Sequence, residues 1–186
     1  MPASGAKAIS GRAGPAATRR GPALRILGID PGLASMGWGV VEAREGRLHH
    51  LGHGCLVTSK DEALGDRLFT ISSGIEELIA NWKPGLAGME SLFFWKNVSS
   101  ALPVAEARGV IRLAFVRAGI DLADFSPTAI KQAVVGSSRA DKEQVQAMVK
   151  LLLGLPDLPK PDHAADALAA AICRWHHEGP LADPRR

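Results

Sequence analysis

Residues 25–32 read RILGIDPG, a short apolar run that stops at an acid and a Pro-Gly pair. This pattern is typical of a buried strand that ends in a turn. Two further apolar segments, residues 36–43 and 48–58, are separated by Glu45-Gly46, which favours a hairpin. The three segments together predict three antiparallel strands at the start of the fold.

The rest of the chain alternates between helical and strand patterns. Residues 61–82 place apolar side chains three and four positions apart, which indicates an amphipathic helix. Antiparallel strands followed by strand–helix crossovers predict an α/β fold in which helices flank a mixed five-stranded sheet. The other expected elements are strands over residues 86–90 and 120–125, and helices over residues 99–118, from Ser126-Pro127, over 141–153 and over 162–177.

A length of 186 residues fits one compact domain. We expect a disordered arm over residues 1–22, a globular domain over residues 23–178 and a flexible tail over residues 179–186. An organellar transit peptide is the alternative interpretation of the arm, which is rich in Gly, Ala, Pro and Arg. No stretch approaches the roughly 18 apolar residues of a membrane span, so a transmembrane protein is excluded.

The net charge of +3 is unevenly distributed. Residues 1–25 hold five basic residues and no acid, which leaves 17 basic and 19 acidic residues in the remaining chain. If the domain binds nucleic acid, it therefore does so through a local basic patch or through bound cations.

The cysteines and most of the histidines match no metal-binding motif. Cys55 and Cys173 share no motif spacing, so we expect inert core thiols in a reducing compartment, the cytoplasm. The histidines expected at surface or half-buried positions are His49, His50, His53, His176 and His177.

Carboxylates stand where predicted strands end. Asp30 ends the first strand and Glu90 the fourth, so they lie side by side if these strands are neighbours. Asp166 lies in the last helix, with His163 three positions earlier on the same side. Acids that converge repel one another unless a cation neutralises them, and oxygen ligands suit Mg²⁺ or Mn²⁺. Two such ions about 4 Å apart favour in-line displacement at phosphorus.

Each of these residues also has an ordinary structural explanation. An Asp before Pro-Gly is frequent in turns, and a Glu at a strand end is usually just solvated. Asp162 is most simply a helix N-cap, and His163 a surface residue at a helix start. The spacing alone therefore supports a carboxylate site only weakly.

Several motifs follow one another along the chain: residues 29–32 (IDPG), 37–40 (GWGV), 89–93 (MESLF), 96–97 (KN), 107–109 (ARG), 131–136 (KQAVVG) and 163–169 (HAADALA). As an ordered set they resemble the bacterial RuvC family of Holliday junction resolvases. The resemblance implies an RNase H-like fold and a homodimer with two Mg²⁺ ions per subunit, which Mn²⁺ can replace. It further implies paired nicks in a four-way DNA junction during recombination and repair, with 5′-phosphate and 3′-hydroxyl ends, and a branch-migration partner of the RuvA/RuvB type.

The resemblance also implies roles for individual residues. Asp30, Glu90 and Asp166 match the catalytic, metal-binding carboxylates of the family. His163 stands where many members have a fourth Asp and some have His, so it is a further expected catalytic residue, either as a metal ligand or as a proton carrier. The DNA contacts that the resemblance implies are Phe93 near the junction centre, Lys131 and Lys142 near the phosphates, and Lys96 with Asn97.

The helix over residues 99–118 has an apolar face that is either core or a subunit interface. Because family members pack helices in their dimer, we expect part of this face to lie between subunits. Its members are Val104, Ala107, Val110, Ile111, Ala114 and Phe115.

Three other classes of protein fit parts of the pattern. A nuclease of the same fold that acts on RNA–DNA hybrids or flaps is the first. The second is half of an actin-like ATPase, because residues 29–32 followed by Gly37 and Gly39 resemble a phosphate-binding hairpin; the chain is too short for that class. The third, a non-catalytic DNA-binding module, leaves the set of acids unexplained.

Overall fold

The computed structural model describes residues 23–91 and 98–178. The predicted arm over residues 1–22 and tail over residues 179–186 lie outside these ranges. The first predicted helix begins at Leu64 rather than at residue 61, and the other boundaries differ by about one residue. In chain order the elements are β1 (Leu24–Asp30), β2 (Ser35–Arg44), β3 (Arg47–Val57), α1 (Leu64–Trp82), β4 (Leu86–Glu90), α2 (Val98–Arg117), β5 (Asp121–Phe125), α3 (Pro127–Val135), α4 (Lys142–Leu153) and α5 (Asp162–Glu178).

The strands form one mixed five-stranded sheet with the order β3-β2-β1-β4-β5. β2 is antiparallel to both β1 and β3, whereas β4 runs parallel to its neighbours β1 and β5. The predicted α/β fold is therefore confirmed. Because β1 and β4 are parallel neighbours, their last residues reach the same edge of the sheet.

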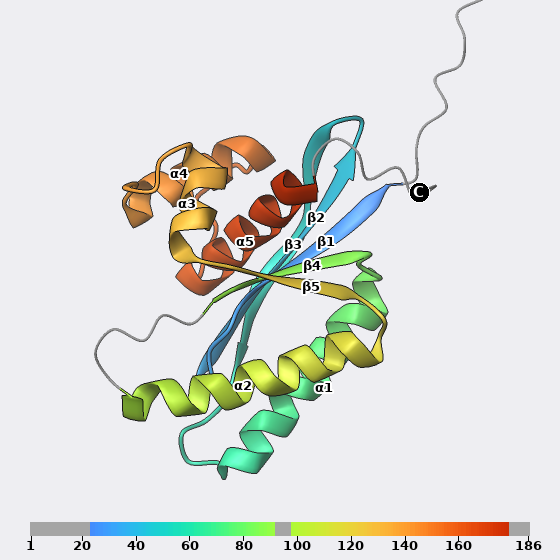
Figure 1. The fold of residues 1–186 in the computed structure, drawn as a ribbon, viewed down its shortest axis with the longest axis vertical. Coiled ribbons are helices and arrows are strands. Elements are labelled where there is room, and N and C mark those ends of the chain that lie inside the picture. Colours follow the sequence, from blue (N-terminus) through green and yellow to red (C-terminus); the bar gives the residue numbers. More distant parts are fainter. Residues whose placement is uncertain (1–22, 92–97, 179–186) are drawn as a thin grey trace, which may run out of the picture.

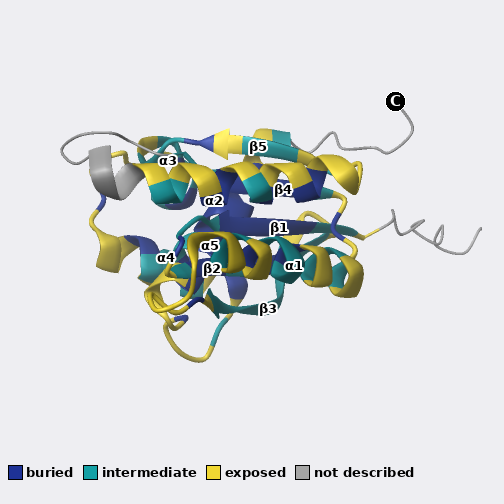
Figure 2. Cartoon of the chain, turned by 90° about the horizontal axis from the view of Figure 1, so that it is seen from below, coloured by how far each residue is buried: buried dark blue, intermediate teal, exposed yellow. Residues whose placement is uncertain are grey.

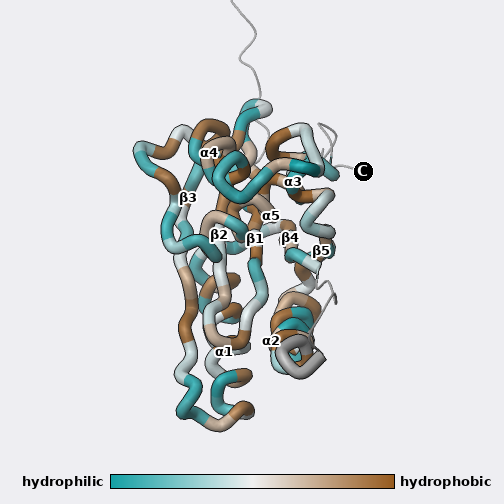
Figure 3. Tube along the Cα trace, turned by 90° about the vertical axis from the view of Figure 1, so that its left-hand side faces the viewer, coloured by the Kyte–Doolittle hydropathy of each residue, from teal (hydrophilic) through white to brown (hydrophobic). Residues whose placement is uncertain are grey.

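Helices cover both faces of this sheet (Figure 1). Figure 3, in which the strands follow one another across the view from β3 to β5, shows α3 and α4 on one side and α1 and α2 on the other. Each face buries its own apolar cluster: Ile29, Met89 and Ile75 belong to the one beside α1, and Val41 and Leu168 to the one beside α5. The central strands form the buried layer between the helices (Figure 2).

Most of the apolar face predicted on α2 belongs to this core. Ala107, Ile111, Ala114 and Phe115 are buried in the cluster that α2 shares with α1 and the sheet, and Val110 packs against it. These four residues therefore cover the chain's own sheet, whereas Val104 and Val110 are only half-buried. The expectation that part of the face lies between subunits stays a prediction. Within the described part of α2, the large exposed apolar side chains are Leu102, Leu113 and Val116.

Capping residues fix the starts of the two short helices. The Ser126 hydroxyl accepts a hydrogen bond from the Ala129 backbone N–H at 3.1 Å, and Pro127 is the first residue of α3, as predicted. Asp141 and Gln144 form a capping box at the start of α4. These caps set where α3 and α4 begin, and each helix carries one of the predicted DNA-binding lysines.

At Gly28 and Gly37 the backbone of α5 lies directly against the sheet. A Cβ atom added at Gly28 of β1 would lie 1.9 Å from the carbonyl oxygen of Ala167. One added at Gly37 of β2 would lie 1.9 Å from the carbonyl oxygen of His163. Gly37 pairs with Asp30 in the sheet, so this close approach brings the start of α5 over the end of β1.

Gly28→Ala is expected to destabilise the protein by about 1–3 kcal/mol, because α5 must move away from β1 to admit the methyl group. Chemical denaturation measures the change in the free energy of unfolding. Gly65→Ala is the matched control, since a Cβ atom at Gly65 of α1 meets nothing within 4 Å. Equal stability of the two variants would show that the contact between α5 and the sheet is loose.

Candidate active site

Two acids end neighbouring parallel strands. Asp30 is the last residue of β1 and Glu90 is the last residue of β4. The two strands are in register from Ile26 to Ile29, with Ile29 beside Met89. The predicted neighbourhood of the two strands is therefore observed, and both carboxylates leave the sheet at the same edge.

The start of α5 adds an imidazole and a third acid. Ligand atoms of Asp30, His163 and Asp166 all lie within 4.8 Å of one another. The Nδ1 atom of His163 is hydrogen-bonded to Oδ2 of Asp30 at 2.7 Å. Residues 133 positions apart in the sequence thus meet because α5 lies directly over the glycines of β1 and β2.

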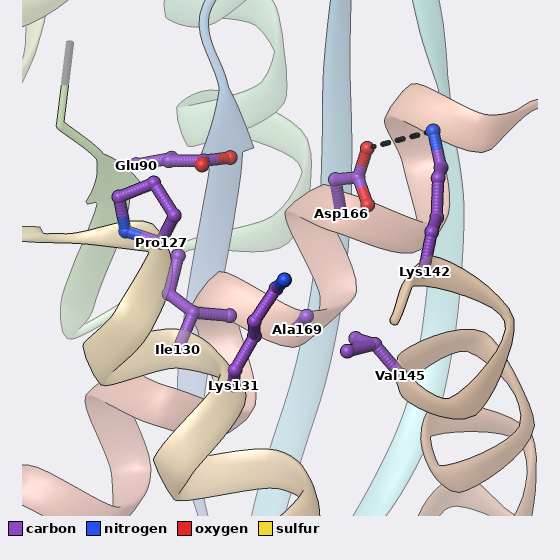
Figure 4. Close-up of a pocket in the computed structure, with 8 residues that line it drawn as sticks. All are labelled: Glu90, Pro127, Ile130, Lys131, Lys142, Val145, Asp166 and Ala169. Carbon is purple, nitrogen blue, oxygen red and sulfur yellow. Dashed lines mark ion pairs between the residues drawn. The ribbon is translucent and has the colours of Figure 1, made fainter. Parts of the chain in front are cut away.

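Glu90 and Asp166 line a pocket of about 180 Å³ together with both predicted lysines. Figure 4 shows Glu90 on one side of this pocket and Asp166 on the other; Lys131 of α3 points toward the space between them, and Lys142 of α4 lies beside Asp166. The Nζ atom of Lys142 lies 3.4 Å from Oδ2 of Asp166 and 3.1 Å from Oδ2 of Asp162. The pocket thus holds one acid from the end of β4, one acid from α5 and two lysines.

Asp162 does not act as the helix N-cap that its sequence position suggested. It is the first residue of α5, and its carboxylate pairs with Lys142 and accepts a hydrogen bond from Gln146 at 3.3 Å. The contact with Lys142 lowers the pKa of Asp162. Burial acts to lower the pKa of Lys142, but the hydrogen bond to Asp162 and the charge of Asp166 outweigh it and raise that pKa. Asp162 therefore holds the lysine beside Asp166.

Burial and the proximity of the acids raise the pKa values of Glu90 and Asp166. Burial, followed by the negative charges of Asp30 and Asp166, raises the pKa of Glu90 from 4.5 to about 7. Burial and the charge of Asp30 also raise the pKa of Asp166. Arg108 and Lys131 act on Glu90 in the opposite direction without cancelling the effect. The site therefore has excess negative charge that a cation would relieve.

The donor set fits a divalent metal ion. Asp30, Glu90 and Asp166 offer carboxylate oxygens, which Mg²⁺ and Mn²⁺ prefer, and His163 offers one nitrogen. The mutual distances of Asp30, His163 and Asp166 allow them to share an ion, and Glu90 faces the same pocket as Asp166. Among the described residues, the group of three or more His, Cys, Asp or Glu side chains close enough to hold a metal ion consists of Asp30, His163 and Asp166.

A buried arginine behind Glu90 was not predicted as part of the site. Arg108 of α2 is only 9% exposed, and its Nη1 atom donates a hydrogen bond to the backbone carbonyl of Glu90. A sequence signal existed: Arg108 lies four positions after Val104 and three before Ile111, so a charge interrupts the apolar stripe of the helix.

The loop that follows Asp30 has its own anchor, which was also missed. The Thr58 hydroxyl donates to the carbonyl of Leu33 at 2.6 Å, and the Thr58 N–H donates to the carbonyl of Ala34 at 3.1 Å. Nε of Arg67 donates to the same hydroxyl at 2.9 Å. These bonds tie the turn after β1 to the end of β3 and the start of α1.

The remaining predicted residues fall into two groups. Phe93, Lys96 and Asn97 lie outside the described residues. The other histidines are half-buried or exposed, as predicted, and Cys173 is a buried free thiol. Cys55 is only half-buried, so it is not the core residue that was expected.

Comparisons with known proteins identify relatives of this chain. The family model described as "Crossover junction endodeoxyribonuclease RuvC" matches residues 26–174. The protein of that name from Chloroflexus aggregans is 51% identical over 150 residues, which cover 81% of this chain and 92% of the relative. The one from Heliobacterium modesticaldum is 49% identical over 151 residues, which cover 81% and 93%.

A solved structure is similar over most of the domain. "T. thermophilus RuvC in complex with Holliday junction substrate" is 32% identical, with a TM-score of 0.80 over 83% of this chain and 94% of that one. The predicted resemblance and the RNase H-like fold are therefore confirmed. The chain belongs to the RuvC family of crossover junction endodeoxyribonucleases.

Proposed function

We propose that this chain is a metal-dependent endonuclease that resolves four-way DNA junctions by paired, symmetric nicks during recombination and repair. The observation that carries the proposal is the meeting of Asp30, His163 and Asp166, beside Glu90, at one edge of the sheet. The similar RuvC protein of Thermus thermophilus was solved in complex with a Holliday junction substrate, which supports the same substrate here.

Asp30, Glu90, Asp166 and His163 would hold two Mg²⁺ ions, and Mn²⁺ would substitute for them. When bound, such ions act as Lewis acids that stabilise the negative charge developing on the phosphate oxygens. Lys131 and Lys142 line the same pocket, where their ammonium groups can bind the phosphates on either side of the scissile bond. The products are 5′-phosphate and 3′-hydroxyl ends.

To bind a DNA phosphate, Lys142 must give up one of its two ion pairs. In the structure this lysine bridges Asp162 and Asp166. Once a cation neutralises Asp166, the lysine is released from that partner and becomes available to a phosphate, while Asp162 keeps it near the pocket. Phe93, Lys96 and Asn97 complete the proposed contacts to the junction.

Two opposed strands require two active sites, so we propose a homodimer. The exposed Leu102, Leu113 and Val116 on the described part of α2 supply an apolar surface for it. A branch-migration complex of the RuvA/RuvB type is the proposed partner on DNA, and the cytoplasm is the proposed compartment, in keeping with the free thiols of Cys55 and Cys173. Among the described residues, no helix is both long and apolar enough to span a bilayer.

The proposal is tested with a synthetic four-way junction labelled on each strand in turn. With Mg²⁺ or Mn²⁺ we expect paired nicks at symmetric positions, products that ligase can seal, and no cleavage in EDTA. A linear duplex, a flap and an RNA–DNA hybrid of the same sequence are the control substrates. Equal or faster cleavage of a control substrate would contradict junction specificity, and ATP hydrolysis without nicking would point to the ATPase class.

A further inference from the structure

We propose that Arg108 is a positioning residue that holds Glu90 at the metal site, with Asp124 holding Arg108 in turn. The inference rests on the proposed function, since it assigns Glu90 to the metal ions. No predicted role covered either residue. A chain of contacts that leads from α2 through the end of β4 to the pocket supports the inference.

The first contact fixes the backbone of Glu90. Nη1 of Arg108 donates to the Glu90 carbonyl, and the next N–H, that of Ser91, donates to the carbonyl of Phe125 at 2.7 Å. The end of β4 is therefore tied to α2 by one bond and to β5 by the other. Glu90 is the last residue of the strand, so these bonds determine where its side chain enters the pocket.

The second contact fixes the guanidinium group itself. Nη2 of Arg108 lies 2.6 Å from Oδ1 of Asp124, and Nη2 of Arg112 lies 2.7 Å from Oδ2 of the same carboxylate. One acid of β5 thus binds two arginines a helical turn apart. A planar guanidinium held at both ends is a rigid donor, which a lysine would not reproduce.

Packing alone does not explain why a charged side chain is buried at this position. The Arg108 side chain is 10% exposed, and the residues at its helical spacing, Ile111 and Phe115, are fully buried apolar side chains. An aliphatic residue would fill such a stripe at lower desolvation cost, since a buried ion pair is rarely better for stability than apolar packing. The contact with Glu90 supplies a reason for the charge.

Arg108 also acts on Glu90 through space. Its positive charge opposes the burial and the neighbouring acids that raise the pKa of Glu90. Mutation of residues that orient metal ligands from behind typically weakens metal affinity or activity by about 10- to 100-fold. We expect an effect of this size from the loss of Arg108.

The test measures Mn²⁺ binding to DNA-free protein, by the EPR signal of free Mn²⁺, beside junction nicking. Arg108→Met is expected to weaken Mn²⁺ binding about tenfold or more and to slow nicking about 10- to 100-fold. Arg108→Lys keeps the charge but not the two-ended geometry, so it should restore part of both losses. Junction binding in Ca²⁺, followed by fluorescence anisotropy, should change little.

Arg174→Met is the matched control. Arg174 is 5% exposed on α5 and pairs with Glu178 and with Asp121, which lies at the opposite end of β5 from Phe125. The Arg174→Met variant should lose about as much stability in thermal unfolding as Arg108→Met, but it should keep wild-type Mn²⁺ affinity. Unchanged Mn²⁺ affinity in Arg108→Met would overturn the positioning role and leave Arg108 a structural ion pair.

A second variant serves if Arg108→Met does not fold. Asp124→Asn alters the exposed side of the contact and leaves the core filled. It should weaken Mn²⁺ binding in the same direction, on the order of threefold, because an amide oxygen without the negative charge of the carboxylate holds the guanidinium less tightly. Wild-type Mn²⁺ affinity in this variant would also overturn the role. If wild-type protein binds Mn²⁺ but does not nick junctions, the proposed function fails while the comparison of Mn²⁺ affinities still decides the role of Arg108.

Discussion

Asp30→Asn is expected to slow junction nicking by about 10³-fold or more, equivalent to about 4 kcal/mol of transition-state stabilisation. Asp30 is central to the site: it is hydrogen-bonded to His163, lies within 4.8 Å of ligand atoms of His163 and Asp166, and its charge acts on Glu90. The amide keeps the size of the side chain but removes the charge that attracts divalent ions.

Nicking and binding must be scored on the same junction to interpret this variant. Gel-shift or anisotropy measurements in Ca²⁺ should show wild-type binding, because the phosphate contacts are assigned to other side chains. Glu77→Gln, a carboxylate-to-amide change on the exposed surface of α1, is the control and should nick normally. Wild-type nicking by Asp30→Asn would reject the carboxylate site.

Raising the pH from 5 to 8 is expected to destabilise the metal-free protein through Glu90. The folded state raises the pKa of this group from 4.5 to about 7, so between these values the folded protein binds more protons than the unfolded chain. Stability from the neutral carboxyl is therefore fully present below pH 4.5 and is lost as the pH rises through about 7. The change amounts to about 3 kcal/mol for Glu90.

Denaturant unfolding of EDTA-treated protein at several pH values measures this effect. Glu90→Gln should remove most of the loss, whereas Asp166, whose pKa is also raised by burial and by Asp30, contributes the same sign to both proteins. Mg²⁺ should restore the stability of the wild type at pH 8, since a ligand that binds only the folded state stabilises it. If the free energy of unfolding changed with pH in parallel for the two proteins, the raised pKa of Glu90 would be contradicted.

The sequence carried enough information for the sheet and for the position of its acids. Asp30 and Glu90 were predicted at strand ends because an apolar run that stops at an acid can be recognised locally, and the parallel pairing of β1 with β4 then brings them together. Asp166 and His163 share a helix side by spacing alone. Their arrival over β1 depended on Gly28 and Gly37, whose role is clear only when the helix is seen against the sheet.

Contacts that depend on tertiary placement were not predictable in the same way. The apolar stripe of α2 does not reveal from its spacing whether it covers its own sheet or another subunit, and the structure assigns Ile111 and Phe115 to the core. The ion pair of Asp162 with Lys142 joins two helices, and no local pattern shows that these helices meet. The sequence therefore favoured a capping role for Asp162 instead. The contact of Arg108 with Glu90 likewise joins elements whose relative position no local pattern encodes.

The last helix supplies two of the four proposed ligands and lies across the middle of the sheet. During synthesis, a nascent chain that has emerged only as far as α4 holds Asp30 and Glu90 but neither His163 nor Asp166. It also lacks the alanine-rich surface that covers β1 and β2. Under the proposed function, the nuclease site is therefore incomplete until nearly the whole domain has left the ribosome, and chains that end before α5 are expected not to cut DNA.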